Sequence, residues 1–123
     1  MKKLVVLIVD DSLVIIERFI EILNEMDNIE MVLYARNFTE GSQLLDEIQP
    51  DIALLDINLP GKSGIELLRL IQRERPDMKV IMITNQATDH YKKICASLGA
   101  QHFFDKSNEF EQIPGAISTI RLN

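Results

Sequence analysis

The sequence predicts an α/β fold of the doubly wound type, (βα)5, with helices on both faces of a five-stranded parallel sheet in a three-layer α/β/α sandwich. Three observations predict it. Short runs rich in β-branched residues alternate five times with longer stretches of helical period. Three of these runs are apolar at every position, as strands buried on both faces are. The connections between the runs are short, so parallel strands require right-handed crossovers.

The five β-rich runs divide into central and edge strands by their polarity. Leu4–Val9, Ile52–Leu55 and Val80–Ile83 are wholly apolar, so we expect them at the centre of the sheet. Glu30–Ala35 and Gln101–Phe104 mix polar with apolar residues, so we expect them at its two edges.

The stretches between the strands each carry one apolar stripe at helical spacing. The predicted core positions are Ile15, Phe19, Ile22 and Met26 in the first helix, Leu44, Leu45 and Ile48 in the second, Leu68 and Ile71 in the third, Ala87, Tyr91, Ile94 and Leu98 in the fourth, and Phe110, Ile113, Ile117 and Ile120 in the fifth. Three pairs have the spacing of a capping box, in which a short polar side chain satisfies free helix N–H groups: Asn37 with Glu40, Ser63 with Glu66, and Asn108 with Glu111.

Length and composition restrict the function. With 123 residues we expect one domain, residues 1–123, without room for a separate output module. Nineteen acidic against thirteen basic residues leave a net charge of −6, which repels a nucleic-acid backbone, so we expect no direct nucleic-acid binding. No run approaches the ~18 apolar residues of a membrane helix, and a single cysteine, Cys95, fits a reducing compartment. We therefore expect a cytoplasmic protein that does not contact a membrane.

Chemically useful residues stand at the carboxyl ends of the predicted strands, where sites form in an open parallel sheet. They are Asp10 and Asp11 after the first strand, Asp56 after the third, Thr84 after the fourth, and Asp105 and Lys106 after the fifth. Converging carboxylates repel one another, and a hard divalent cation such as Mg²⁺ relieves that repulsion through carboxylate and carbonyl oxygens. An aspartate beside such an ion is a suitable nucleophile towards phosphorus. Lys106 would then neutralise phosphoryl charge, and Thr84 would donate a hydrogen bond to a phosphoryl oxygen.

These residues carry a family resemblance. Asp10-Asp11, the run Leu54–Gly61 around Asp56 with Ser63-Gly64 after it, Thr84, and Asp105-Lys106 occur in order at matching strand ends. In this the chain resembles the response-regulator receiver domains of two-component signalling, from Leu4 to about Ile120. The resemblance implies the flavodoxin-like strand order 2-1-3-4-5.

The resemblance also implies a role for individual residues. Asp56 is similar to the phosphoacceptor, which receives a phosphoryl group from the phosphohistidine of a sensor histidine kinase or phosphotransfer protein. Asp11, Asp56 and the backbone carbonyl of Asn58 resemble the direct Mg²⁺ ligands, and Asp10 would act mostly through a bound water. Lys106 matches the lysine that contacts the phosphoryl group. Thr84 and Phe103 match the hydroxyl and aromatic residues that switch the signalling surface.

The chain departs from the family pattern after the lysine. Proline commonly follows there, often behind a cis peptide, but Ser107 stands in this sequence. A cis bond without proline costs ~2.5–4 kcal/mol, so we expect a trans Lys106–Ser107 bond and a reshaped loop. Phe103 also lacks the hydroxyl of the tyrosine found in many relatives. Asn58 and Gln86 occupy the two variable positions that, by resemblance, tune the lifetime of the phosphate.

The predicted function is a phosphorylated switch that catalyses its own phosphorylation and dephosphorylation and is not a turnover enzyme. Three other functions are alternatives to it. A degenerate receiver would bind partners without phosphorylation, but the acidic and lysine positions are intact. A phosphatase of the haloacid-dehalogenase type needs a second aspartate two residues after its nucleophile on the first strand, where this chain has Ser12 or Leu13. A nucleotide or flavin binder needs a first loop rich in Gly, Ser or Thr. We expect the output to reach a downstream protein or an output domain outside the chain.

Overall fold

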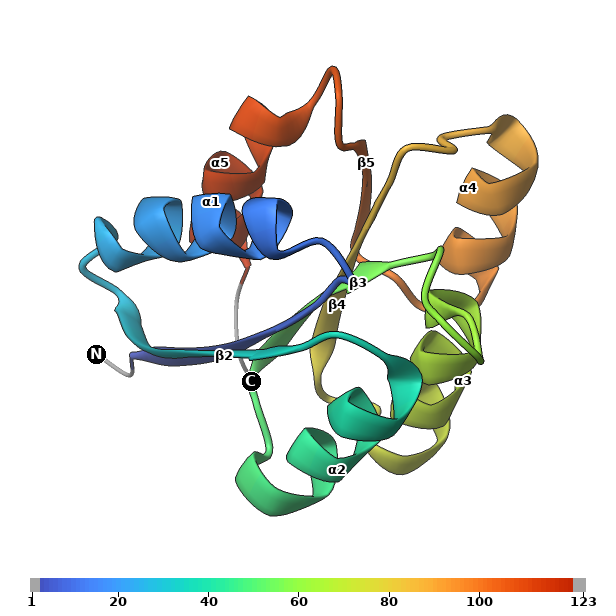
Figure 1. The fold of residues 1–123 in the computed structure, drawn as a ribbon, viewed down its shortest axis with the longest axis horizontal. Coiled ribbons are helices and arrows are strands. Elements are labelled where there is room, and N and C mark those ends of the chain that lie inside the picture. Colours follow the sequence, from blue (N-terminus) through green and yellow to red (C-terminus); the bar gives the residue numbers. More distant parts are fainter. Residues whose placement is uncertain (1–2, 121–123) are drawn as a thin grey trace.

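The computed structural model describes residues 3–120 and contains one five-stranded sheet (Figure 1). The strands are β1 (Leu4–Val9), β2 (Ile29–Ala35), β3 (Ile52–Asp56), β4 (Lys79–Thr84) and β5 (His102–Asp105). The helices are α1 (Leu13–Asn24), α2 (Phe38–Ile48), α3 (Gly64–Glu74), α4 (Asp89–Ser97) and α5 (Ile113–Thr119), the last preceded by a 3-10 turn, η1 (Phe110–Gln112). All strand pairs are parallel and the order is β2-β1-β3-β4-β5, which confirms the predicted fold.

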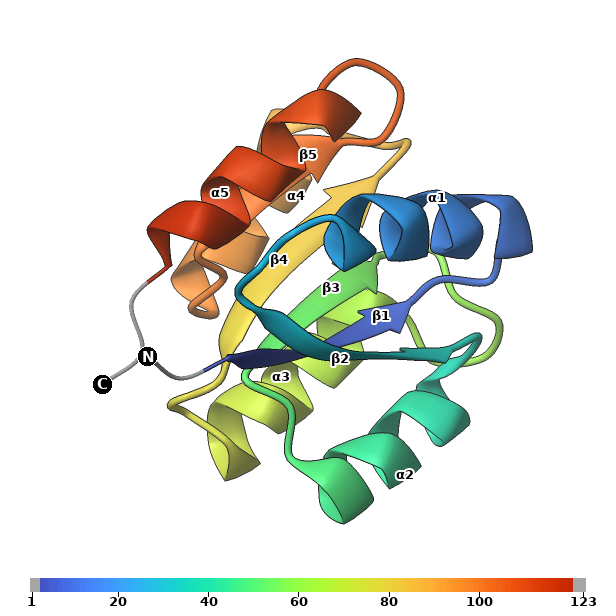
Figure 2. The same ribbon diagram turned by 90° about the vertical axis from the view of Figure 1, so that its left-hand side faces the viewer.

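The sheet separates two hydrophobic cores. Helices α1 and α5 cover one face, and α2, α3 and α4 cover the other (Figure 2). Successive residues of a strand point to opposite faces, so Ile8 packs into the first core and its neighbour Val9 into the second. This explains why the central strands are apolar at every position.

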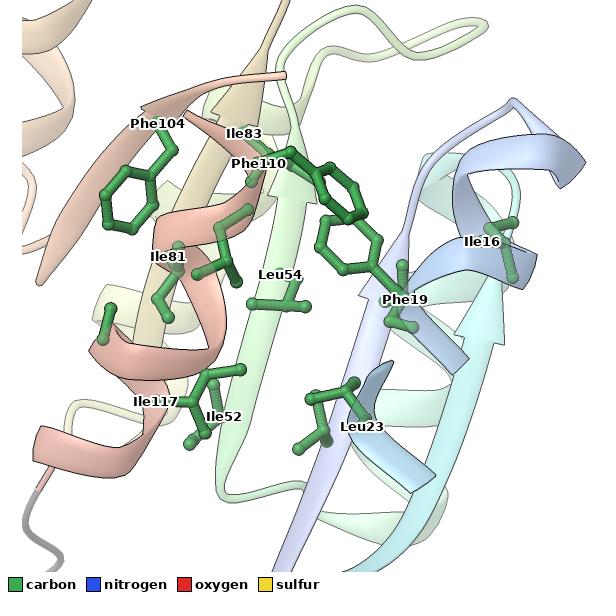
Figure 3. Packing of buried hydrophobic residues seen from close by; sticks show 14 of the residues in the cluster. Ile16, Phe19, Leu23, Ile52, Leu54, Ile81, Ile83, Phe104, Phe110 and Ile117 are labelled. Carbon is green, nitrogen blue, oxygen red and sulfur yellow. The ribbon is translucent and has the colours of Figure 1, made fainter. Parts of the chain in front are cut away.

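Aromatic stacking in the first core joins α1 to η1, the turn that precedes α5. Phe19 of α1 and Phe110 of η1 stack with their ring centroids 4.7 Å apart, above Leu54 of β3 (Figure 3). The Arg18 guanidinium lies over the Phe110 ring, 4.0 Å from its centroid. The contact fixes the end of the β5–α5 connection against α1.

The predicted edge strands are confirmed. β2 and β5 stand at the two ends of the sheet, and β2 leaves Met31 and Tyr34 about half exposed. The two adjacent phenylalanines of β5 divide between the two faces, with Phe104 in the first core and Phe103 against the second.

The helix predictions hold with local corrections. In α1 the fully buried residues are Ile16, Phe19 and Leu23, whereas Ile15 and Ile22 are only partly buried. Met26 and Phe110 pack into the first core but are wrong as helical positions, because α1 ends at Asn24 and Phe110 lies in η1, before α5. Ile48 is wrong as a core position, because it ends α2 and is 41% exposed. Ala87 is also wrong as a helical position, because α4 begins after it, at Asp89.

The capping predictions have mixed outcomes. Asn37 caps α2 as predicted, since its Oδ1 accepts from the Glu40 N–H at 2.8 Å and its Nδ2 donates to the Glu40 carboxylate. Ser63 stands at the start of α3 but its side chain makes no capping hydrogen bond. The Asn108–Glu111 box is wrong, because η1 and not α5 follows it, and the Asn108 N–H is taken by Asp105. Two caps were not predicted: Ser12 caps α1 and Thr88 caps α4.

Within residues 3–120, no helix has both the length and the apolar character needed to cross a membrane.

Candidate functional site

The strand register brings the predicted residues to one edge of the sheet. Asp10 follows the last residue of β1, and Asp56 is the last residue of β3, where it aligns with Ile83 of β4. Thr84 ends β4 and aligns with Asp105 of β5. Because neighbouring parallel strands end at nearly the same level, their final side chains form a single cluster. β2 contributes no chemical group from its own end, but Arg36 just beyond it donates from Nη2 to the Asp11 carbonyl at 3.1 Å.

A buried ion-pair triad lies at the centre of this cluster. Lys106 Nζ donates to Asp56 Oδ2 at 2.9 Å and also pairs with Asp10 Oδ2. Asp10 is 0%, Asp56 3% and Lys106 7% exposed. The remaining oxygens also have partners: Asp10 Oδ1 accepts from the Ser12 N–H at 2.9 Å, and Asp56 Oδ1 accepts from the Asn58 N–H at 3.2 Å. The triad therefore contains two carboxylates for one ammonium group.

Burial and neighbouring charge compete in the triad. Burial raises the pKa of Asp56, and the negative charge of Asp10 adds to that rise, while hydrogen bonding and attraction from Lys106 oppose it. The net direction is upward. For Lys106, burial alone would lower the pKa, but the bonds and charges of Asp10 and Asp56 outweigh burial, so its pKa is raised. Lys106 is therefore a cation at neutral pH.

Three carboxylates have the geometry of a metal site. One oxygen each of Asp10, Asp11 and Asp56 can be chosen so that all three lie within 4.8 Å of one another. Asp10 and Asp56 are buried and Asp11 is exposed, so the cluster opens to solvent on the Asp11 side. Hard oxygen donors of this kind suit Mg²⁺, so the residues present fit such an ion. The predicted ligation by the Asn58 carbonyl stays a prediction.

Gly64 holds the strand end that carries Asp56. Its N–H donates to the Ile57 carbonyl at 2.9 Å, and a Cβ atom built on Gly64 would lie 1.8 Å from the Asp56 carbonyl oxygen. Only glycine allows the start of α3 to approach β3 so closely. The sequence shows this glycine eight positions after Asp56 but does not reveal the contact.

Thr84 and Phe103 lie where the resemblance implies, on adjacent strands. Thr84 is fully buried, its Oγ1 accepts from the Gln86 N–H at 3.0 Å, and its carbonyl accepts from the Lys106 N–H at 3.0 Å. Phe103 is partly buried against the core on the α4 side of the sheet. Their roles in switching stay predictions.

The loop after Lys106 has the predicted trans geometry, since no peptide bond between residues 3 and 120 is cis. Its organising residue was not predicted. The Asp105 carboxylate does not belong to the cluster of Asp10, Asp11 and Asp56, and it accepts from the N–H groups of Ser107 and Asn108.

Comparison with known proteins gives consistent matches. Residues 6–118 match the family model described as the response regulator receiver domain. The chain is 33% identical over 108 residues to the transcriptional regulatory protein YdfI of Bacillus subtilis, covering 88% of this chain and 50% of that protein. It is 28% identical over 115 residues to the response regulator GacA of Pseudomonas aeruginosa, covering 94% of this chain and 54% of that protein. The chain thus spans about half the length of these curated relatives.

Solved structures agree with the fold. The response regulator domain of Thermotoga maritima CheB superposes with a TM-score of 0.83 at 26% identity, covering 95% of this chain and 92% of that one. A LuxR-family response regulator from Aurantimonas sp. SI85-9A1 gives a TM-score of 0.87 at 24% identity, with 95% and 84% covered, and supports the fold alone. Because the family model matches residues 6–118 of its 123, the chain belongs to the response regulator receiver domains of two-component systems.

Proposed function

We propose that this receiver domain accepts a phosphoryl group on Asp56 in a Mg²⁺-dependent reaction and acts as a signalling switch. The observation that carries the proposal is the buried contact of Lys106 Nζ with Asp56 Oδ2 at 2.9 Å, beside the carboxylates of Asp10 and Asp11. A cation fixed beside a carboxylate nucleophile supplies the positioning and charge neutralisation that phosphoryl transfer requires.

The donor in the proposed reaction is a phosphohistidine of a sensor histidine kinase or a phosphotransfer protein. An Asp56 carboxylate oxygen attacks phosphorus, the P–N bond to imidazole breaks, and the product is an aspartyl phosphate with a free histidine. Asp11, Asp56 and the Asn58 carbonyl would hold Mg²⁺, with Asp10 acting mostly through a water. When bound, Mg²⁺ neutralises phosphoryl charge, and Lys106 and Thr84 contact the phosphoryl oxygens.

The domain is proposed to be a switch and not a turnover enzyme. Its phosphate is lost by hydrolysis at the same site, at a rate tuned through Asn58 and Gln86. We propose that the output passes to a downstream protein or to an output domain outside this chain, in the cytoplasm. The net charge of −6 argues against direct nucleic-acid binding by these residues.

A receiver that only binds partners is the alternative. The complete set of Asp10, Asp11, Asp56 and Lys106 at one sheet edge favours the phosphorylated switch. The Asp-nucleophile phosphatase is less well supported, because Ser12 and Leu13 stand where that class of enzyme has its second aspartate, two residues after a nucleophile at Asp10 or Asp11.

Intact-mass measurement with the small phosphodonor acetyl phosphate tests the proposal. The wild-type chain should gain the mass of one phosphoryl group in Mg²⁺ and none in excess EDTA, and Asp56→Asn should gain none. The Asn side chain has nearly the same shape, so the variant tests the nucleophile with little change in packing. Labelling of both proteins, or of neither, would contradict Asp56 as the phosphoacceptor, and the second result would favour the partner-binding alternative.

A further inference from the structure

The turn after β5 is closed by the side chain of the residue that precedes Lys106. Asp105 Oδ1 accepts from the Ser107 N–H at 2.7 Å and from the Asn108 N–H at 3.3 Å. Asp105 Oδ2 accepts from the Asn108 side-chain amide at 3.4 Å. One carboxylate thus satisfies the first two backbone donors after Lys106, and charge-assisted bonds of this kind are among the stronger ones in proteins.

Glu109 fixes Asp105 from the other end of the turn. Its Oε1 accepts from the Asp105 N–H at 3.0 Å, while its own N–H donates to the Asp105 carbonyl at 2.9 Å. The backbone from 105 to 109 is therefore closed on itself by four bonds that do not involve the rest of the sheet. Figure 1 shows this segment as the connection between β5 and α5, above the sheet edge.

The closed turn matters for Lys106 because a strand holds its backbone only through the N–H group. Its N–H donates to the Thr84 carbonyl of β4 at 3.0 Å, but β5 ends at Asp105, and no strand follows it up to residue 120, where the described part of the chain ends. A lysine side chain has many rotamers, and its ammonium group must reach both Asp10 and Asp56. The direction in which the Lys106 side chain leaves its Cα atom thus depends on the turn that follows.

We propose that Asp105 is a positioning residue for Lys106, acting through the backbone N–H groups of Ser107 and Asn108. The effect of this positioning on phosphoryl transfer rests on the proposed function. This positioning role requires the Ser107 N–H, because a proline at position 107 would have no N–H hydrogen to donate to Asp105. Asp105 itself touches neither the carboxylate cluster nor the nucleophile, and it affects the reaction only by directing the lysine.

Three substitutions at position 105 separate geometry from charge. Asp105→Asn keeps an acceptor oxygen at the same distance from the backbone, Asp105→Glu keeps the charge but moves it one methylene farther, and Asp105→Ala removes both. Phosphorylation by acetyl phosphate should slow by about tenfold in the Ala and Glu variants, because a misplaced catalytic group loses on the order of 10- to 100-fold. Asp105→Asn should recover most of the rate.

A purely structural role would not give this pattern. Magnesium affinity, measured by titration, should stay within about twofold of wild type in all three variants, because none of the three carboxylates of the cluster is changed. Amide exchange at Ser107 and Asn108 should accelerate in the Ala and Glu variants. The Lys106 amine, nearly buried in wild type, should react faster with an acylating reagent when peptide mapping follows its modification.

The exchange and acylation measurements do not depend on phosphorylation, so they separate the two proposals. If wild type takes no phosphate, the proposed function fails while exchange and acylation still test the positioning of Lys106. Wild-type rates and wild-type acylation in Asp105→Ala would overturn the role of Asp105. The role of Asp105 would also be overturned if Asp105→Glu was phosphorylated at the wild-type rate while Asp105→Asn was as slow as Asp105→Ala. The negative charge, and not the geometry of the turn, would then control the rate. If the Ala variant does not fold, the comparison of Asn with Glu decides in the same way.

Discussion

At the scale of single residues, the site holds charges that do not cancel. Asp10 and Asp56 face one ammonium group, that of Lys106, and Asp11 adds a third carboxylate at the solvent side. Asp10 is already occupied by Lys106 and the Ser12 N–H, whereas Asp11 contributes an exposed carboxylate. Asp10 and Asp11 therefore differ in how freely their carboxylates can contact an incoming cation.

Asp11→Ala should weaken Mg²⁺ binding strongly, and Asp10→Ala should weaken it less, because Asp11 is expected to contact the ion directly and Asp10 mostly through a water. Both changes remove one negative charge, so the comparison separates direct ligation from long-range attraction. Calorimetric titration of folded protein measures the effect. Asp77→Ala, at an exposed position in another loop, is the control for net charge. Equal losses in the Asp10 and Asp11 variants would contradict direct ligation by Asp11.

Cys95 offers a pH-dependent test of the second core. Burial raises the pKa of its thiol from 9.0 to about 11. The unfolded chain therefore loses this proton at lower pH than the folded chain does. Between pH 9 and 11 the folded state binds more protons, so the free energy of unfolding falls as pH rises.

We expect this fall to be steeper in wild type than in Cys95→Ala by about 2 kcal/mol across that window, at ~1.4 kcal/mol per pKa unit. Urea unfolding at intervals from pH 8 to 11 in reducing buffer measures the difference. The alanine variant retains every other titratable group of the chain, so the comparison isolates the thiol. Parallel pH profiles of the two proteins would show that the thiol is not shielded in solution.

At the scale of elements, the site depends on how closely α3 approaches the end of β3. Gly64 meets the Asp56 carbonyl at a distance that leaves no space for a Cβ atom, and its N–H bonds to the next carbonyl, that of Ile57. The start of α3 is thus in close contact with the backbone of Asp56, the proposed phosphoacceptor. Backbone carbonyls cannot move aside as flexible side chains do.

Gly64→Ala should lower the free energy of unfolding by about 1–3 kcal/mol, as overpacking does, and should also slow phosphorylation of Asp56. Gly115→Ala is a matched control in α5, where an added Cβ meets nothing within 4 Å. That change should instead raise stability by about 0.5–1 kcal/mol, because alanine favours helix over glycine. Thermal or urea unfolding gives both values. Similar effects of the two substitutions would contradict the close approach at Gly64.

At the scale of the whole molecule, we expect phosphorylation of Asp56 to alter the surface formed by α4, β5 and α5, through Thr84 and Phe103. Thr84 ends β4 at the site, and Phe103 on the neighbouring β5 packs against the second core, on the α4 side of the sheet. New charge on Asp56 can draw the Thr84 hydroxyl towards it and free space for the Phe103 ring. The shift is limited by the difference in phosphoryl contacts between the two states, typically ~1–3 kcal/mol.

Thr84→Ala should therefore still accept phosphate but lose much of the conformational response. Its structural cost should be small, since the Gln86 N–H that bonds Thr84 Oγ1 belongs to an exposed residue and can bond water. Backbone amide NMR shifts with and without beryllofluoride, an aspartyl-phosphate mimic, measure the response in both proteins. Wild-type shifts confined to loops near Asp56, or an equally full response in Thr84→Ala, would contradict this switch mechanism.

The sequence predicted the sheet well because burial on both faces leaves an unmistakable apolar run, as in β1 and β3. It failed at helix ends, where a single hydrogen bond decides the boundary. Thr88 and not an earlier residue caps α4, and the Asn108 N–H donates to Asp105, whereas in a capping box it would donate to the Glu111 carboxylate.

For the candidate site, residue identity and strand order were sufficient to bring Asp10, Asp56 and Lys106 together. What the sequence could not reveal were contacts that depend on distances between backbones. The approach of Gly64 to the Asp56 carbonyl and the turn closed by Asp105 both belong to this class. Neither leaves a periodic pattern, so each becomes visible only once three-dimensional positions are known.

The long sequence separation of the ion-pair triad has a consequence for folding. Asp56 and Lys106 are 50 positions apart, and Asp10 is farther still from Lys106. Bringing such distant residues together requires closing long loops, so the cluster forms only after β1, β3, β4 and β5 have paired. A nascent chain that has not yet supplied β5 has the acidic residues but lacks the ammonium group. A cation bound at the finished site would therefore stabilise the assembled sheet as a whole, by mass action, and slow its global unfolding.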